Sequence, residues 1–194
     1  MKWMSFLSLV APALLAMGCS SSRQGWTAQK KYPKEALEQD YRVFRSVLEE
    51  SHPSLYWFTS KDSMDYFFDY GFSRLQDSMT EPAFKNILSY VINKINCGHT
   101  FVRYSKKYSH YLDTARLKLF PLSFKVWPDT VVIAGNLYRD DSTFTRGTPV
   151  TAINGYSTRS LADTFLRHVP GDGYNENSKY QIMSNLGRFG ALYR

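Results

Sequence analysis

Apolar residues recur at helical spacing in three stretches between residues 33 and 98, and this pattern predicts three helices. The first helix follows Pro33, which suits a first turn, and it ends at His52 because Pro53 disfavours helical geometry in the residue before it. The apolar stripes are Leu37, Tyr41, Phe44 and Leu48; then Met64, Phe67, Phe68, Gly71, Phe72 and Leu75; then Phe84, Ile87, Leu88, Val91, Ile92 and Ile95. We therefore expect a helical N-terminal domain over residues 33–98.

The second and third helices carry start signals. Thr59 or Ser60 can cap the second helix, because a side-chain hydroxyl accepts a hydrogen bond from the unpaired N–H groups of the first turn. Thr80 followed by Pro82 predicts the start of the third helix, and Gly98 is its expected C-cap.

From His99 onward apolar and polar residues alternate, a pattern typical of strands. Strands are predicted over residues 101–104 and 117–127. Pro128 begins a turn that would join the second strand to residues 130–134 in a hairpin.

The last part of the chain predicts a further strand and two helices. Residues 150–153 are β-branched and apolar, and the Asn-Gly turn at residues 154–155 closes that strand. A helix is expected over residues 158–168, and Asn177 or Ser178 would cap a last helix. Helices followed by strands and short helices indicate the α+β fold class.

The first residues have the pattern of an export signal. Lys2 supplies a positive start, and residues 3–17 are apolar apart from three positions. Small residues, Ala16 and Gly18, stand at both places that a signal peptidase reads. The apolar run is too short for a spanning helix, so we expect residues 1–18 to be a cleaved signal peptide.

Cys19 lies directly after Gly18, and this favours lipoprotein processing over ordinary secretion. Ala16 replaces the leucine that is usual three positions before the lipidated cysteine. Each buried acyl methylene contributes about 0.8 kcal/mol, so acyl chains on Cys19 would hold the protein at a bilayer. We expect a lipid-anchored protein of the bacterial cell envelope, on the outer membrane and facing the periplasm or the cell surface, with a flexible tether over residues 19–32.

Composition narrows the range of functions. The formal net charge of +7 is spread along the chain, and the densest basic runs, at residues 30–31 and 106–107, are too short for a nucleic-acid surface. Once Cys19 is acylated only Cys97 remains, so neither an intramolecular disulfide nor a cysteine metal site is available. We expect no cofactor, no metal and no nucleic-acid partner. The lysines stand in polar segments and are expected to be solvated.

Four short segments stand in an order that points to a known family. They are Glu50-Ser51-His52-Pro53-Ser54-Leu55-Tyr56 (first motif), Ile95-Asn96-Cys97-Gly98-His99-Thr100 (second motif), Gly147-Thr148-Pro149-Val150-Thr151-Ala152-Ile153-Asn154-Gly155 (third motif) and Gly171-Asp172-Gly173-Tyr174-Asn175 (fourth motif). In this order and spacing the chain resembles the tail-specific (C-terminal processing) serine peptidases. Members of that family are commonly exported or lipid-anchored.

The resemblance implies a β-rich, PDZ-like domain over residues 99–176, in which the third motif would form a strand and a turn before a helix. It also implies a set of candidate peptide-binding or structural residues, namely His99, Gly147, Val150, Ile153, Asn154 and Gly155. The family's serine nucleophile and lysine base belong to an α/β core, which is absent from these residues and would follow Arg194. Residues 177–194 would begin that region.

No catalytic residue is assigned within the chain. A serine-lysine dyad needs a hydroxyl within hydrogen-bonding reach of a desolvated lysine. Ser178 and Lys179 are neighbours in sequence but would point to different faces of a helix. Ser157 follows a glycine at position 155 but lacks the second glycine of a nucleophile turn.

We expect the histidines and the aromatic cluster to have structural roles rather than catalytic or ligand-binding ones. His52 is expected to end a helix with a local hydrogen bond, and His99 to be a hydrogen-bonding centre rather than a base. His110 and His168 are interpreted as surface or helix-end residues, and the aromatic cluster at residues 56–58 as core.

Two functions remain open at this stage. The first is the substrate-receiving, N-terminal part of a lipid-anchored tail-specific serine peptidase, with peptides or unstructured protein segments as partners. The alternative is a non-catalytic envelope lipoprotein that binds peptides or proteins through a PDZ-like domain.

Overall fold

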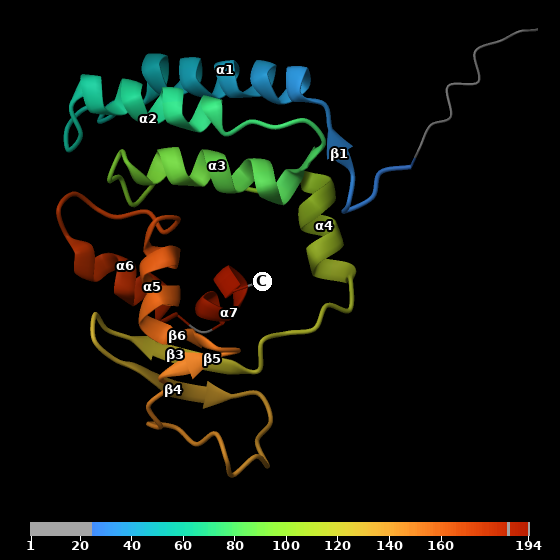
Figure 1. Ribbon diagram of the computed structural model, residues 1–194, viewed down its shortest axis with the longest axis vertical. Helices are drawn as coiled ribbons and strands as arrows, with labels where there is room; N and C mark the ends of the chain where they lie inside the picture. The colour runs from blue at the N-terminus through green and yellow to red at the C-terminus, as the bar shows by residue number, and fades with distance from the viewer. Residues whose placement is uncertain (1–24, 186, 194) are drawn as a thin grey trace, which may run out of the picture.

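The computed structural model describes residues 25–185 and 187–193, and this part of the chain combines helices with small antiparallel sheets (Figure 1). Seven helices lie in it: α1 (Lys34–Ser51), α2 (Lys61–Ser73), α3 (Glu81–Asn93), α4 (Lys106–Thr114), α5 (Thr158–Leu166), α6 (Glu176–Met183) and α7 (Arg188–Tyr193). Three pairs of strands accompany them: β1 (Lys31–Tyr32) with β2 (Met79–Thr80), β3 (Leu122–Val126) with β4 (Val131–Asn136), and β5 (Ala152–Ile153) with β6 (Tyr156–Ser157). The mixture of helix and strand agrees with the α+β class expected from the sequence.

The first two helices begin close to their predicted signals. Pro33 is the N-cap of α1 rather than its first helical residue, and His52 ends the helix as predicted. Of the two candidate caps of α2, Ser60 is used, since its Oγ accepts a hydrogen bond of 3.3 Å from the N–H of Ser63. Local sequence signals therefore define these helix ends to within one residue.

α3 begins after Thr80 as predicted, although the Thr80 side chain makes no capping hydrogen bond. The helix ends at Asn93 and does not reach Gly98. After Asn93 the chain tightens into i→i−3 hydrogen bonds, and Asn96 takes a left-handed conformation with φ of 55°. Asparagine tolerates this conformation better than most residues, so Asn96 turns the chain before the predicted glycine does.

α1, α2 and α3 enclose two adjoining apolar clusters. Their buried members are Leu48, Leu55, Met64, Phe68, Val91, Ile92 and Ile95 in one, and Leu37, Tyr41, Leu75 and Leu88 in the other. The Tyr41 hydroxyl donates a hydrogen bond of 2.8 Å to the carbonyl of Phe68. A Cβ atom on Gly71 would collide with that hydroxyl and would lie 2.7 Å from Cγ2 of Val91. Gly71 therefore allows α1 and α3 to approach α2 closely.

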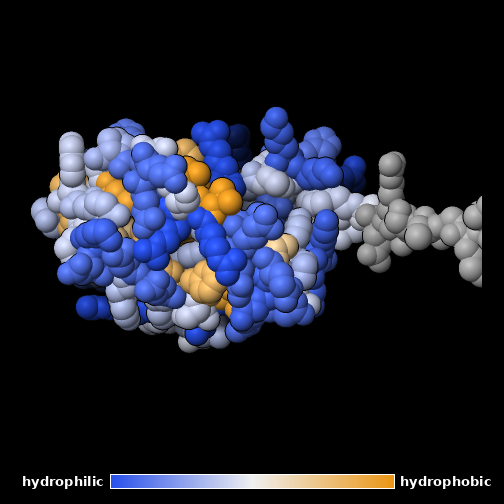
Figure 2. Space-filling model, turned by 90° about the horizontal axis from the view of Figure 1, so that it is seen from above, coloured by the Kyte–Doolittle hydropathy of each residue, from blue (hydrophilic) through white to orange (hydrophobic). Residues whose placement is uncertain are grey.

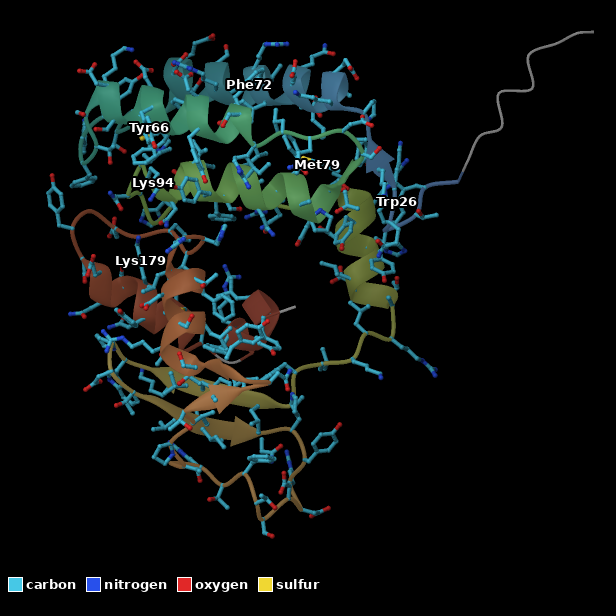
Figure 3. The ribbon with its side chains drawn as sticks, viewed as in Figure 1. Trp26, Tyr66, Phe72, Met79, Lys94 and Lys179 are labelled. Carbon is cyan, nitrogen blue, oxygen red and sulfur yellow. The ribbon has the colours of Figure 1, made fainter. Side chains whose placement is uncertain are left out.

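The described end of the predicted tether is folded, so that part of the prediction is wrong. Lys31 and Tyr32 pair with β2 as the antiparallel strand β1. Trp26 packs edge-on against the rings of Tyr108 and Tyr111 on α4, with centroid distances of 6.2 and 6.3 Å (Figure 3). Apolar and aromatic contacts hold this segment against the helices.

Residues 101–104, predicted as a strand, form an irregular segment that leads into α4. The N–H and Oγ of Ser105 both donate to the Glu81 carboxylate, at 2.6 and 2.9 Å, which ties the segment to the start of α3. Ser105 also caps α4 by accepting a hydrogen bond from the N–H of Tyr108. α4 was not predicted, because it is only nine residues long, has few apolar residues and buries none of them fully.

The predicted hairpin is present, but its first strand is shorter than residues 117–127. β3 begins only after Pro121, a residue that has no N–H to donate to a neighbouring strand. The pair Val126 and Val131 flanks the turn, as the sequence predicts. The hairpin therefore begins where both strands can exchange hydrogen bonds.

A third extended segment lies along the other edge of β4. The N–H of Gly147 donates to the carbonyl of Ile133 at 2.8 Å, and the N–H of Ile133 donates to the carbonyl of Thr148 at 2.9 Å. Val150 continues the pairing with a bond of 2.8 Å to the carbonyl of Val131. β4 is thus hydrogen-bonded on both sides.

α5 agrees with the predicted helix apart from its last two residues, whereas α6 begins after Asn175, ahead of the predicted caps Asn177 and Ser178. α5, α6 and α7 cover the hairpin and close one apolar cluster with it. The buried members are Phe124, Val126, Val131, Ile133, Ala162, Phe165, Val169, Met183 and Phe189.

We call residues 25–114 the helical half, and residues 120–185 with 187–193 the hairpin half. In Figure 1 α1, α2 and α3 lie together on one side, and the hairpin with α5, α6 and α7 lies on the other. The buried side chain of Asn93 links the halves, since its Nδ2 donates a hydrogen bond of 2.9 Å to the carbonyl of Leu166. That carbonyl belongs to the last turn of α5 and has no partner within its own helix.

Candidate functional site

Three of the four sequence motifs meet where the helical half faces the hairpin half. His52 Nε2 lies 2.8 Å from Thr100 Oγ1, and this hydrogen bond joins the first motif to the second. The N–H of Gly173 donates to the carbonyl of Asn96 at 2.7 Å and joins the fourth motif to the second. We call this cluster of His52, Asn96, Thr100 and Gly173 the motif junction.

Close packing of small residues shapes the motif junction. A Cβ atom on Gly98 would lie 3.4 Å from Cβ of Asp172. Gly173 has a φ of 59°, and a Cβ atom there would lie 3.1 Å from the Phe58 ring. Phe58 also packs edge-on against Tyr174, with ring centroids 5.5 Å apart. The glycines of the second and fourth motifs therefore allow these loops to lie against each other.

His99 is exposed and makes none of the hydrogen bonds found among the described residues. The bonding role expected of it falls instead to its neighbours Thr100 and Asn96. His52 differs from expectation as well, because its side chain makes a hydrogen bond with Thr100, 48 residues away in sequence, and not with a neighbouring residue. Its Nδ1 is buried and has no hydrogen-bond partner among those residues.

The other five candidate residues lie together in the hairpin half, whereas His99 lies in the helical half. Gly147 has a φ of 91° and begins the segment that pairs with β4. Val150 and Ile153 are half-buried and pack against the apolar cluster of the hairpin half. These three residues shape the strand and its packing.

Asn154 and Gly155 form the turn between β5 and β6. Both have a left-handed backbone, with φ of 50° and 84°, which the tight two-residue turn requires. Asn154 Nδ2 donates a hydrogen bond of 2.7 Å to the Tyr193 hydroxyl, so this turn is tied to α7. The structure gives both residues a conformational role.

Lys94 and Lys179 lie on facing sides of the space between α3 and α6 (Figure 3). Both are half-buried, which corrects the expectation that the lysines are solvated. A Cβ atom on Gly171 would lie 2.6 Å from Cε of Lys179, so this side chain packs directly against the fourth motif. Lys94 Nζ lies 4.6 Å from the centroid of the Tyr90 ring.

Burial lowers the pKa of both lysines. For Lys179 the charge of Lys94 lowers the pKa further, and Glu176 opposes this effect. For Lys94 the second cause is the charge of Arg167. A half-buried amine with a lowered pKa is one requirement of a lysine base.

The second requirement, a hydroxyl held by the lysine, is not met by the adjacent serine. Ser178 Oγ donates a hydrogen bond of 2.7 Å to the carbonyl of Asn175. No hydrogen bond between Lys179 and a serine occurs in the part of the chain that the structure describes. We therefore assign no nucleophile to these residues.

Two structural interpretations from the sequence need correction. His168 stands at the end of α5, which is one of the two positions expected for it, but it is not a surface residue: it is half-buried, its Nδ1 is buried without a partner among the described groups, and burial lowers its pKa. The aromatic segment at residues 56–58 is not core. Trp57 is 72% exposed, and the buried residue of this loop is Leu55. Neighbouring apolar residues in a loop do not reveal which of them points inward.

An apolar pocket of about 340 Å³ opens where β3 begins and β4 ends. It is lined by Leu119, Phe120, Pro121, Leu122, Ser123, Gly135, Asn136, Leu137, Gly187, Gly190 and Ala191. Leu119 and Leu137 are each more than 60% exposed, at 66% and 62%. The helix beside this pocket is α7, and α5 contributes no lining residue.

Unpaired backbone runs directly beside this pocket. The N–H groups of residues 118–120 make no backbone hydrogen bond with any described residue, whereas Leu117 donates to the carbonyl of Ala115 at 2.8 Å. The next backbone hydrogen bond along the chain is at Pro121, whose carbonyl accepts it from the N–H of Leu137 at 2.9 Å. The pocket and its backbone edge were missed from the sequence, because α7 and the pairing of residues 121 and 137 are not visible in local patterns.

Several sequence-based expectations concern lipidation, export and metal binding. Cys19 and the predicted signal peptide lie outside the described residues. No described helix combines the length and the apolar character that crossing a bilayer requires. Within residues 25–185 and 187–193 no three His, Cys, Asp or Glu side chains are placed to hold a metal ion. Comparisons with models of protein families and with curated proteins found no match to this sequence.

Proposed function

We propose that this chain binds extended peptides or unstructured protein segments in its hairpin half. The observation that carries this proposal is the apolar pocket beside the unpaired backbone of residues 118–120. An extended peptide can add to a free backbone edge through main-chain hydrogen bonds and place a side chain in an adjacent pocket. A volume of about 340 Å³ lies at the lower end of small-ligand sites. The pocket therefore suits one or two apolar side chains.

The broader proposal is that the chain is the substrate-receiving part of a tail-specific serine peptidase. The order of the four motifs supports it, as does the contact between the second and fourth motifs through Asn96 and Gly173. Under this proposal residues 33–98 are a three-helix domain and residues 99–176 a PDZ-like domain. Proteolysis would occur at a serine-lysine site that follows Arg194.

Anchoring at the cell envelope belongs to the same proposal. It rests on Cys19, directly after the small residues of the export signal. Cells fed labelled palmitate should incorporate label into the chain, and Cys19→Ala should abolish both the label and membrane retention. A variant that keeps the label would remove the anchor from the proposal.

The alternative is a peptide-binding lipoprotein without peptidase activity, which needs the apolar pocket but no serine-lysine site. Ser178 is committed to the carbonyl of Asn175 and does not face Lys179, so these neighbours do not form a dyad. The reading frame after Arg194 separates the two functions. An encoded serine and lysine in an α/β region would support the peptidase, and their absence would leave the binding protein.

Peptide binding is tested by mapping chemical shifts on residues 19–194, left unacylated, with short peptides that end in an apolar residue. We expect the largest shifts at residues 118–122, Leu137 and Ala191. Leu119→Ser removes an apolar wall of the pocket and should weaken binding about tenfold. Affinity should be weak in absolute terms, because a short peptide has few anchoring side chains.

The matched control is Val43→Ser, which changes an apolar residue on α1 that is 58% exposed and lies far from the pocket in sequence. It should leave the affinity unchanged. Ala191→Trp provides a second test, because a larger side chain would fill the pocket without removing a wall. Shifts along α5, or equal effects of the Leu119 and Val43 variants, would show that the peptide does not use this pocket.

A further inference from the structure

A larger cavity, of about 530 Å³, lies between the two halves and carries positive charge from three separate elements. Lys85 comes from α3, Arg103 from the irregular segment before α4, and Arg188 from the start of α7. His168 also lines this cavity, and no aspartate or glutamate is among the lining residues that the structure describes. We call it the cationic cavity.

Lys85, Arg103 and Arg188 make no ion pair with any acidic side chain that the structure describes. All ion pairs found in the described residues lie on α1 and α2. Lys85 Nζ instead lies 4.8 Å from the centroid of the Tyr104 ring, and the guanidinium carbon of Arg103 lies 5.1 Å from that of Phe101. Burial lowers the pKa of Lys85, and the positive charge of Arg188 lowers it further.

Lys85 is half-buried, whereas Arg103 and Arg188 are exposed. Like charges that line one cavity repel one another unless an anion compensates for them. The rest of the lining suits an organic ligand. Ser89 and Ser109 offer hydroxyl groups, and Ile92 and Ile182 offer apolar surface. The cavity therefore combines charge for an anionic head with an apolar wall for its body.

We propose that the cationic cavity binds a phosphate ester, with the phosphate held by Lys85, Arg103 and Arg188 and the organic part against Ile92 and Ile182. A phosphate monoester carries about −1.5 to −2 charges near pH 7, which matches the two arginines and Lys85 better than the single charge of a carboxylate does. Arginine also presents paired N–H donors that fit phosphate oxygens. The ester can be a soluble molecule or a lipid headgroup. This proposal does not rest on peptide binding, although α7 contributes residues to both the cavity and the pocket.

Calorimetric titration of residues 19–194 with hexyl phosphate, in phosphate-free buffer, tests the site. We expect saturable binding that inorganic phosphate displaces at higher concentration.

Lys85→Gln should weaken binding at least about tenfold, because a charge-assisted hydrogen bond is lost. Arg188→Gln is the second variant, since Arg188 is exposed and its replacement does not disturb a core. Lys125→Gln, an exposed charge on β3 outside the cavity, should leave the affinity unchanged.

Two further ligands and one vesicle assay decide the ligand class. Hexanol binding as tightly as hexyl phosphate would overturn the anion site, and hexanoate binding as tightly would overturn the choice of phosphate. Absence of hexyl phosphate binding, or an equal loss of affinity in the Lys125 variant, would overturn the whole proposal.

Sedimentation with phosphatidylcholine vesicles that contain phosphatidic acid shows whether the phosphate ester is a lipid headgroup or a soluble molecule. Retention that Lys85→Gln abolishes indicates a lipid headgroup, and binding of the soluble ester alone indicates a soluble ligand.

Discussion

The helical half and the hairpin half are stabilised by different interactions. On the outer face of the helical half Arg45 contacts Glu49, Asp65 and Asp69 at 2.8, 2.7 and 3.1 Å. That face, seen in Figure 2, is largely hydrophilic with separate apolar spots. The hairpin half contains no ion pair between described residues, and its centre is a group of aromatic rings around Phe189.

This contrast shows how little the overall charge says about the distribution of charge. The net charge of +7 is compatible with an evenly mixed surface. In the part of the chain that the structure describes, the ion pairs lie on α1 and α2, while Lys85, Arg103 and Arg188 line a cavity without acidic side chains. Exposed ion pairs contribute less than about 1 kcal/mol each, so the apolar cores of both halves should dominate the free energy of unfolding.

The largest expected effect comes from the hairpin half. Phe189→Ala should lower the free energy of unfolding by about 3–5 kcal/mol, because a large buried ring is replaced by a cavity. Phe189 packs edge-on against Phe124 and Phe165, with centroids 4.9 and 5.0 Å apart. Urea titration measures the loss. Tyr138→Ala, at a ring that is 69% exposed, is the control.

Amide hydrogen exchange on the same variant sharpens the comparison between the halves. If they are stabilised separately, the amides of β3 and β4 should lose more protection than those of α1, α2 and α3. Equal loss everywhere would mean that the two halves unfold as one cooperative unit.

Gly71→Ala is expected to destabilise the helical half by about 1–3 kcal/mol, since the added methyl group meets Tyr41 and Val91. Alanine favours helices by about 1 kcal/mol over glycine, so a net loss of stability requires that the clash dominates. Gly25→Ala, where nothing lies within 4 Å, should change stability little. A stabilised Gly71 variant would show that α1 and α3 can move apart without cost.

Asn93→Ala tests the link between the halves. We expect a loss of about 1 kcal/mol, because the carbonyl of Leu166 would lose its donor in a buried place. The loss is moderated by Oδ1 of Asn93, which has no partner among the described groups and disappears in the variant. Asn86→Ala, at an exposed position of the same helix, is the control in urea titration. An unchanged midpoint for both variants would show that this bond does not join the halves energetically.

The smallest effect is electrostatic and confined to the helical half. A hydrogen bond from Lys61 is the main cause that lowers the pKa of Asp65, and the charges of Lys61 and Arg45 add to it. A lowered folded-state pKa stabilises the protein above the unfolded value of about 3.9, and this contribution is lost as the pH falls through the folded-state value. Urea titrations from pH 6 downward should therefore show a difference between wild type and Asp65→Asn that shrinks in acid. A constant difference would contradict this assignment.

Local patterns predicted those elements whose determinants lie close together in sequence. The stripes of α1, α2 and α3 and the turn at Asn154 and Gly155 were visible because helical periodicity and turn chemistry extend over only a few residues. The short and mostly polar α4 and the early end of α3 at Asn93 were not predicted.

The sites were harder to predict than the elements. The bond between His52 and Thr100 spans 48 positions, and no local pattern signals such a pair. The apolar pocket combines the start of β3 and the end of β4 with α7, and the cationic cavity combines the helical half with α6 and α7 of the hairpin half. α7 was not predicted. The sequence singled out the loops of the first, second and fourth motifs. Only the structure shows that these loops contact one another where the two halves meet.

The division of the apolar clusters along the chain has a consequence for the order of folding. The clusters of the helical half use no buried residue beyond Ile95, whereas the cluster of the hairpin half includes Phe189. A chain that emerges with its N-terminus first can therefore complete the helical core while about half of its residues are still to follow. The hairpin half must wait for α7. In pulse-labelled hydrogen exchange we expect protection of α1, α2 and α3 before protection of β3 and β4.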